Sequence, residues 1–330
     1  MTKPYWKIET KYNHNRNYKT PLFMGKGDGK IYTSRRLCGV EFEVSLRNYS
    51  IATGNSWRPI PENIDIISEP FYDTLDKMKN ILYKEDADGI EIITPPLSGK
   101  KFEDQVFELC DLFKKNNLVG SRNCGAHIHV DLNKGYSHYN KRIHLKRLVA
   151  LLDTYMSLEK WFVSTLPMWR RKRHWCQSIF RPISNLKQFN STKDIIKKSF
   201  FNTSGNKKDE IHKIKYGKDC GININYVLKA GNKHIEIRYL EGTTDPINMI
   251  TWASFHTTLI DKVLELYESN PNKLDTINKK ILGIVDWDNK DIYKLSNSRF
   301  NKISSIVRNE FGIHPSVIKH FTQRHKRFIN

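Results

Sequence analysis

The sequence predicts an α+β fold, in which short strands and amphipathic helices follow one another along the chain. Residues 38–46 alternate strictly, with apolar side chains at Val40, Phe42 and Val44 and polar ones between them, as in a half-buried strand. Residues 101–117 repeat apolar side chains at the spacing of one helix face. The chain has 330 residues, 38% of them hydrophobic, which is enough to bury a large core.

Turn and cap signals delimit the next elements. A short strand within 89–97 ends at a double proline, and residues 124–132 alternate again. A long helix is expected from about residue 140 to 166, because a proline follows it. A second helix is expected from 246 to about 269, with an aspartate as N-cap and a proline in its first turn.

The later part of the chain predicts a hairpin and further helices. Residues 221–228 and 233–240 predict two strands that turn at 230–232. The polar, lysine-rich stretch 183–219 predicts loops with short helices, and 271–330 predicts basic helices. We find no internal repeat and no low-complexity tract.

Cysteine usage and the N-terminal residues indicate the compartment. The five cysteines are scattered and never form a C-x-x-C pair, which favours reduced thiols over a disulfide framework or a zinc finger. No run of eighteen apolar residues exists, and the N-terminus lacks the apolar core of a signal peptide. We therefore expect a cytoplasmic protein that does not enter a membrane.

The formal net charge of +20 suits a nucleic acid or another polyanion as a partner. The chain is also rich in lysine, asparagine and isoleucine together, which is typical of an AT-rich coding sequence such as that of a phage. Part of the charge is therefore expected to lie on solvated faces. Charge alone leaves a nucleic-acid partner open.

Charged residues of unusual kinds occupy the polar faces of the predicted strands. If these strands share one sheet, their carboxylates and imidazoles converge on one surface. Clustered carboxylates persist where a cation offsets their repulsion. The residues are Glu41 and Glu43, Glu91, His127 and His129, and Glu236 and Arg238.

This set of ligands is suited to Mg²⁺ or Mn²⁺, because it combines carboxylate oxygens with imidazole. Arg238 lies two residues after Glu236, so it shares that face and could bind a phosphate with both arms of its guanidinium. Metal ions beside a phosphate-binding arginine favour phosphoryl transfer. A zinc-hydrolase pattern is disfavoured because Leu132 stands where a further histidine is needed.

Four segments resemble the amidoligase family and, more distantly, glutamine synthetase and the γ-glutamylcysteine ligases. They are G-V-E-F-E (39–43), D-G-I-E-I-I-T-P-P-L (88–97), C-G-A-H-I-H-V (124–130) and H-I-E-I-R-Y-L-E-G-T-T-D-P (234–246). The resemblance implies a curved antiparallel sheet with helices on its outer face. It also implies a reaction in which ATP phosphorylates a carboxylate and an amine then displaces phosphate to form an amide.

The resemblance also implies roles for single residues. His129 is expected near the ATP phosphates, and Arg238 is expected to steady the transferring phosphoryl group as a catalytic residue beside Glu236. The arginines at 170–173 and Arg181 resemble substrate arginines without a secure alignment, and Asp88 is a candidate extra ligand. The residues that match metal ligands are Glu41, Glu43, Glu91, His127 and Glu236.

Three regions are expected: a basic extension at 1–35, a catalytic domain at 36–270 that carries the resemblance, and a basic helical region at 271–330 that packs on the same domain. The cofactors expected are ATP and Mg²⁺ (or Mn²⁺), and the substrates are a carboxylate and an amine from an amino acid, a peptide or a macromolecule. Two other functions stay open at this point. They are a nucleic-acid-binding or structural role on a decayed ligase fold, and a metal-dependent hydrolase.

Overall fold

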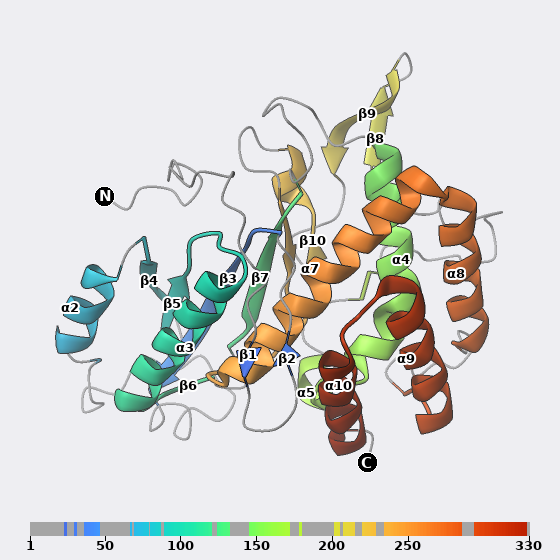
Figure 1. Ribbon diagram of the computed structural model, residues 1–330. Coiled ribbons are helices and arrows are strands. Elements are labelled where there is room, and N and C mark those ends of the chain that lie inside the picture. The colour runs from blue at the N-terminus through green and yellow to red at the C-terminus, as the bar shows by residue number, and fades with distance from the viewer. Residues whose placement is uncertain are drawn as a thin grey trace.

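In the computed structural model, one antiparallel sheet and a set of helices make up most of the described chain (Figure 1). Two small hairpins lie apart from this sheet: β1 (Phe23–Met24) with β2 (Lys30–Ile31), and β8 (Phe201–Ser204) with β9 (Lys207–Ile214). The structure describes residues 23–24, 30–31, 36–46, 67, 69–78, 80–86, 89–120, 124–132, 145–171, 178–179, 201–204, 207–214, 220–228, 234–285 and 294–328.

The central sheet has seven strands in the described residues, and every pair is antiparallel. Their order is β10-β11-β7-β3-β5-β4, and β6 pairs with the end of β3. This sheet agrees with the predicted α+β class. The strands are β3 (Cys38–Leu46), β4 (Leu82–Asp86), β5 (Gly89–Ile93), β6 (Leu118–Val119), β7 (Ala126–Asp131), β10 (Ile222–Asn223) and β11 (His234–Ile237).

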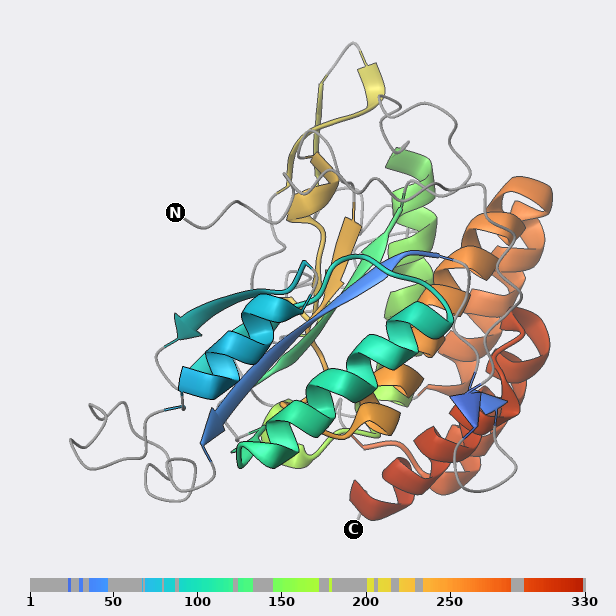
Figure 2. The same cartoon turned by 60° about the vertical axis from the view of Figure 1, so that its left-hand side comes forward.

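Helices cover the apolar face of this sheet. The alternation of β3 buries Val40, Phe42 and Val44 completely or almost completely, and the Phe42 ring meets the Phe113 ring of α3 (Lys100–Lys115) edge to face at 5.3 Å. Helix α7 (Pro246–Ser269) packs against both α3 and β7. Figure 2 shows α3 running alongside β3. The opposite face of the sheet is therefore the one left for the charged side chains.

A second layer of helices packs around α7. Three of them lie in the C-terminal region 271–330, which was predicted to be helical. Helices α4, α8, α9 and α10 all contact α7. Trp161 of α4 lies at their centre, with its ring 5.2–5.5 Å from the rings of Phe255, Phe300 and Phe321. The bounds are α4 (Leu145–Val163), α8 (Pro271–Ile284), α9 (Asn297–Phe311) and α10 (Pro315–Phe328).

Several predicted boundaries agree with the structure. The side chain of Asp245 accepts a hydrogen bond from the backbone N–H of Ile247 at 2.9 Å, and Pro246 opens α7. Strands β10 and β11 form the predicted antiparallel pair, with Ile222 opposite Ile237. The prediction of a strand over all of 221–228 is wrong in its second half, because Asn223 Oδ1 accepts from the N–H of Asn225 at 3.0 Å and the chain turns into a 3₁₀ helix there. The proposed turn of this hairpin lies outside the described residues. Helix α4 ends at Val163, before the proline that was expected to stop it.

The prediction for 183–219 is wrong in part, because β8 and β9 lie within it as a bulged hairpin. Its strands carry few apolar side chains, so the sequence gives little period-two signal. The smaller described elements are α2 (Glu69–Lys77), α5 (Met168–Arg171) and the 3₁₀ turn η4 (Asn225–Leu228).

Among the described residues, no helix has the length and apolar character needed to cross a lipid bilayer. Four cysteines, Cys38, Cys110, Cys124 and Cys220, are buried, and the fifth lies outside the described part of the chain. Burial raises the pKa of the Cys38 and Cys110 thiols, so these two thiols stay protonated at neutral pH.

Candidate active site

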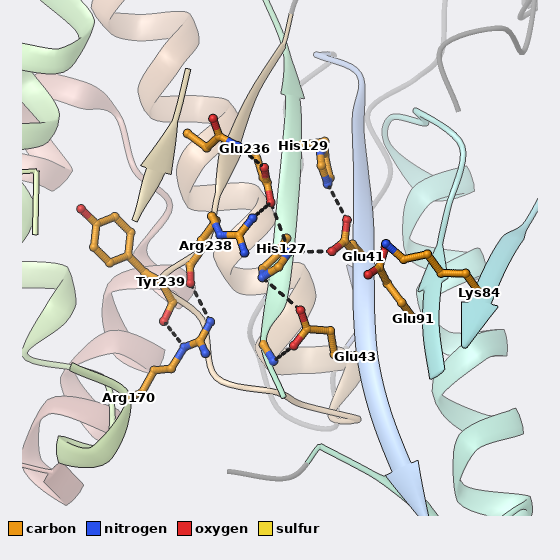
Figure 3. Close-up of polar contacts among 12 residues, drawn as sticks. Glu41, Glu43, Lys84, Glu91, His127, His129, Arg170, Glu236, Arg238 and Tyr239 are labelled. Carbon is orange, nitrogen blue, oxygen red and sulfur yellow. Dashed lines mark hydrogen bonds and ion pairs between the residues drawn. The ribbon is translucent and has the colours of Figure 1, made fainter. Parts of the chain in front are cut away.

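The charged residues of the predicted strands converge on the polar face of the central sheet (Figure 3). Residues directly opposite each other in an antiparallel pair point to the same face. The register therefore brings side chains from β3, β5, β7 and β11 together on one surface. The opposing pairs are Glu41 with His127, Glu43 with Glu91, and His129 with Glu236.

His127 lies at the centre of this surface. Its Nδ1 is 2.7 Å from Oε1 of Glu41 and 3.2 Å from Oε1 of Glu236. Its Nε2 is 3.5 Å from Oε1 of Glu43. The imidazole is only 3% exposed, so these carboxylates act on it through a medium of low dielectric constant.

Two groups of side chains could each hold a metal ion. Within each group, one ligand atom per residue lies within 4.8 Å of the others. The first group is Glu41, His129 and Glu236, and the second is Glu41, Glu43 and His127, so Glu41 belongs to both. Their carboxylate oxygens and imidazole nitrogens suit Mg²⁺ or Mn²⁺.

Close contacts shift the pKa values of these side chains. Burial would raise the pKa of Glu41, but the charges and hydrogen bonds of His127 and His129 outweigh it and hold that pKa well below its usual value. Burial is likewise outweighed at Glu236, whose pKa falls to about 2 beside His127. Burial would lower the pKa of His127, yet Glu41 and Glu236 raise it to about 10. A positive charge at the centre of the carboxylates is therefore strongly stabilised.

Glu236 is held in place by two donors. Arg238 Nη1 donates to its Oε1 at 2.6 Å, and Asn223 Nδ2 donates to its Oε2 at 2.6 Å. Asn223 lies on β10 directly opposite Glu236. Asn223 was not predicted as a site residue, although the alternation of residues 221–228 was the signal that could have placed it on this face.

Glu91 belongs to neither of the two groups in the described structure. Lys84, its partner across the β4–β5 pair, approaches Oε1 of Glu91 to 2.6 Å. Burial and the neighbouring charge of Glu41 raise the pKa of Glu91. Lys84 was missed from the sequence because β4 was not predicted as a strand.

The two described arginines of the 170–173 cluster have different surroundings. Arg170 donates from Nη2 to the carbonyl of Arg238 at 2.7 Å and from Nε to the carbonyl of Tyr239 at 3.2 Å, which puts it beside the site. Arg171 donates to the carbonyls of Leu166 and Ser164, each at 2.7 Å, so it holds the turn that follows the C-terminal end of α4. Residues 172, 173 and 181 lie outside the described residues, as does Asp88.

Comparison with known proteins was made by family and by structure. The family model described as "Putative amidoligase enzyme" matches residues 34–260. A search of curated proteins finds no match. A crystal structure of a bifunctional glutathione synthetase from Pasteurella multocida is similar at 9% sequence identity and a TM-score of 0.43. That similarity covers 90% of this chain but 47% of the other, and no functional argument follows at so low a score.

Proposed function

Because the chain belongs to the amidoligase family, whose model spans most of it, we propose that it is an ATP-dependent carboxylate–amine ligase. A carboxylate oxygen of the first substrate attacks the γ-phosphorus of ATP, and ADP leaves. The nitrogen of the second substrate then attacks the acyl carbon, phosphate leaves and the nitrogen loses a proton. The products are an amide, ADP and phosphate.

One observation carries this proposal: two carboxylate–imidazole groups share Glu41, and a guanidinium lies beside them on Glu236. ATP and a carboxylate are both anions, so a site that joins them must supply positive charge. The donor atoms of both groups fit Mg²⁺ or Mn²⁺, and a bound ion would supply that charge. Arg238 would add a fork of donors suited to a phosphoryl group.

We assign the metal-binding role to the residues of the two groups. Glu41, Glu236 and a histidine would hold one ion, and Glu41 with Glu43 and His127 would hold another. His127 was expected as a metal ligand and His129 near the ATP phosphates, and both imidazoles contact Glu41. Glu91 stays a proposed ligand of the second ion, since it is the cross-strand neighbour of Glu43.

The finer description of the fold and the compartment is also a proposal. The antiparallel sheet with helices on one face supports a glutamine-synthetase-like arrangement with a catalytic domain at 36–270. We propose that 271–330 belongs to the same domain, supported by the contacts of α8, α9 and α10 with α7. A cytoplasmic site of action stays a prediction. The expectation of a nucleic-acid partner gains no support from the family match.

The proposal is tested by ADP release from ATP and Mg²⁺ in the presence of mixtures of amino acids and amines. We expect substrate-stimulated release that Glu236→Gln lowers by about a hundredfold or more, because the change removes the charge of a proposed metal ligand that also binds Arg238. The matched control is Glu265→Gln, the same change at a side chain that is 62% exposed on α7. It should keep wild-type activity.

Two outcomes would contradict the ligase. One is metal-dependent hydrolysis that persists without ATP, which would favour a hydrolase. The other is the absence of stimulated ADP release together with binding to nucleic acid that weakens steeply with salt.

A further inference from the structure

Arg238 lies just beyond the last residue of β11, so the strand ladder alone does not fix its direction. Its backbone is nevertheless held on both sides. Its N–H donates to the carbonyl of Gly221 at 2.7 Å, and its carbonyl accepts from Nη2 of Arg170 at 2.7 Å. The Nε of Arg170 also binds the next carbonyl, that of Tyr239. The guanidinium of Arg170 thus bridges two successive peptide groups.

Gly125 makes room for this guanidinium. A Cβ atom added at Gly125 would lie 2.7 Å from Nη2 of Arg170, 2.9 Å from Nε2 of His127 and 3.3 Å from Oε2 of Glu43. The same Oε2 accepts a hydrogen bond from the backbone N–H of Gly125. These three side chains therefore surround one point at the start of β7. Arg170 reaches the site from α5, a helix outside the sheet.

We propose that Arg170 is a positioning residue of the active site, which fixes the peptide of Arg238 and thereby the approach of the Arg238 guanidinium to Glu236. This inference rests on the proposed ligase function for its kinetic consequences. The hydrogen bonds of Arg170 to the carbonyls of Arg238 and Tyr239 are present whatever the function. The arginine fork is needed because an ammonium group cannot bind both carbonyls in one fixed geometry.

The charge of Arg170 has a separate consequence. Its Nη2 lies close to Glu43 and His127, which form one of the two metal-binding groups with Glu41. A fixed positive charge there lowers the affinity for a cation. Removing the charge should tighten metal binding, whereas general damage to the site should weaken it.

Arg171 offers a matched control. It is as buried as Arg170, at 3% against 2% exposure, and it also binds backbone carbonyls. Its acceptors belong to the end of α4 and to Phe328 of α10, away from the charged face of the sheet. Loss of either arginine should therefore destabilise the fold, but only Arg170 should affect the site.

The experiment compares Arg170→Lys, Arg170→Gln, Arg171→Lys and Arg171→Gln. We expect Arg170→Lys to lower kcat for ADP release about tenfold to hundredfold, with little change in KM, because misplacement of a catalytic group is that costly. We expect Arg170→Gln to bind Mn²⁺ about threefold more tightly in a titration followed by electron paramagnetic resonance. Both Arg171 variants should keep the wild-type kcat and Mn²⁺ affinity.

A double variant tests whether Arg170 acts through Arg238. Turnover of Arg170→Lys combined with Arg238→Lys should equal that of Arg238→Lys alone. The reason is that Arg170 acts through the guanidinium of Arg238, which the Arg238 change has already removed. Independent, multiplying losses would overturn the proposal. So would equal effects of the Arg170 and Arg171 changes on both kcat and Mn²⁺ affinity. If the wild-type protein releases no ADP with any mixture, the ligase function fails, and the Mn²⁺ comparison alone decides on Arg170.

Discussion

The absence of a side chain at Gly125 leaves the space that three charged side chains of the site occupy. The Cα of Gly125 lies between Arg170, His127 and Glu43, and a methyl group there would come closer than 3.0 Å to the first two. Such distances require the neighbours to move. Arg170 is pinned by its two carbonyl acceptors, so the displacement should fall on His127 and Glu43.

We therefore expect Gly125→Ala to weaken Mn²⁺ binding and to lower the rate of ADP release at least tenfold, because it separates two members of one metal-binding group. The matched control is Gly283→Ala on α8, where an added Cβ meets nothing within 4 Å. That change should leave activity intact and stabilise the helix by up to about 1 kcal/mol. Unchanged Mn²⁺ affinity in Gly125→Ala would contradict this account.

The sequence predicted the charged face of the site because period-two alternation is a local property. Glu41 and Glu43 need only a correct β3, and His127 and His129 only a correct β7. Asn223 lies on a predicted strand, but only the register of the β10–β11 pair shows that it stands opposite Glu236. Lys84 was missed because β4 was not predicted as a strand, so its pairing with Glu91 was not expected.

At the scale of elements, long helices with clear caps were predictable, and short pieces were not. Helix α7 carries both an aspartate N-cap and a proline in its first turn. Helix α5 has four residues, too few to show a period, so the sequence could not separate Arg170 from Arg171. Their different acceptors are a property of the folded chain.

The N-cap of α7 gives a prediction at this scale. Asp245 accepts from the N–H of Ile247, and α7 packs against the sheet and the other helices. Asp245→Ala should lower the free energy of unfolding by about 1 kcal/mol, as measured by urea denaturation, since it leaves a helix N–H without its acceptor. Asp245→Asn keeps an oxygen at that position and should cost much less. Equal costs for both variants would show that the cap does not contribute through this hydrogen bond.

At the scale of the whole molecule, charge and apolar side chains are segregated on the two faces of one sheet. The helical layer beneath the apolar face also buries histidines. His256 of α7 stacks on Tyr155, with ring centroids 5.7 Å apart, and its Nδ1 lies 3.0 Å from the tyrosine hydroxyl oxygen. His325 of α10 stacks on Phe300 with centroids 4.0 Å apart. Burial away from water favours the neutral imidazole at both positions.

These buried histidines should make the fold sensitive to acid. Burial lowers the pKa of His256 from 6.5 to about 3, and that of His325 to about 4. Well above pH 6.5 both rings are neutral in the folded and the unfolded chain, so they add no pH dependence there. As the pH falls from 6.5 towards 4, the unfolded chain takes up protons that the folded chain does not, and the free energy of unfolding decreases.

The contribution of His256 can be isolated because the ring is fully buried. Its share of the slope is on the order of 1 kcal/mol per pH unit between pH 6 and pH 4. Urea denaturation of wild type and His256→Leu at pH 7, 6, 5 and 4.5 should show that the variant loses less stability on acidification by that amount per unit. Protonation of the site carboxylates also lowers the free energy of unfolding in acid. This contribution is the same in both proteins, so it cancels in the comparison. Parallel pH profiles would contradict this prediction. They would mean that His256 takes up a proton in the folded protein at the same pH as in the unfolded chain, despite its burial between α7 and α4.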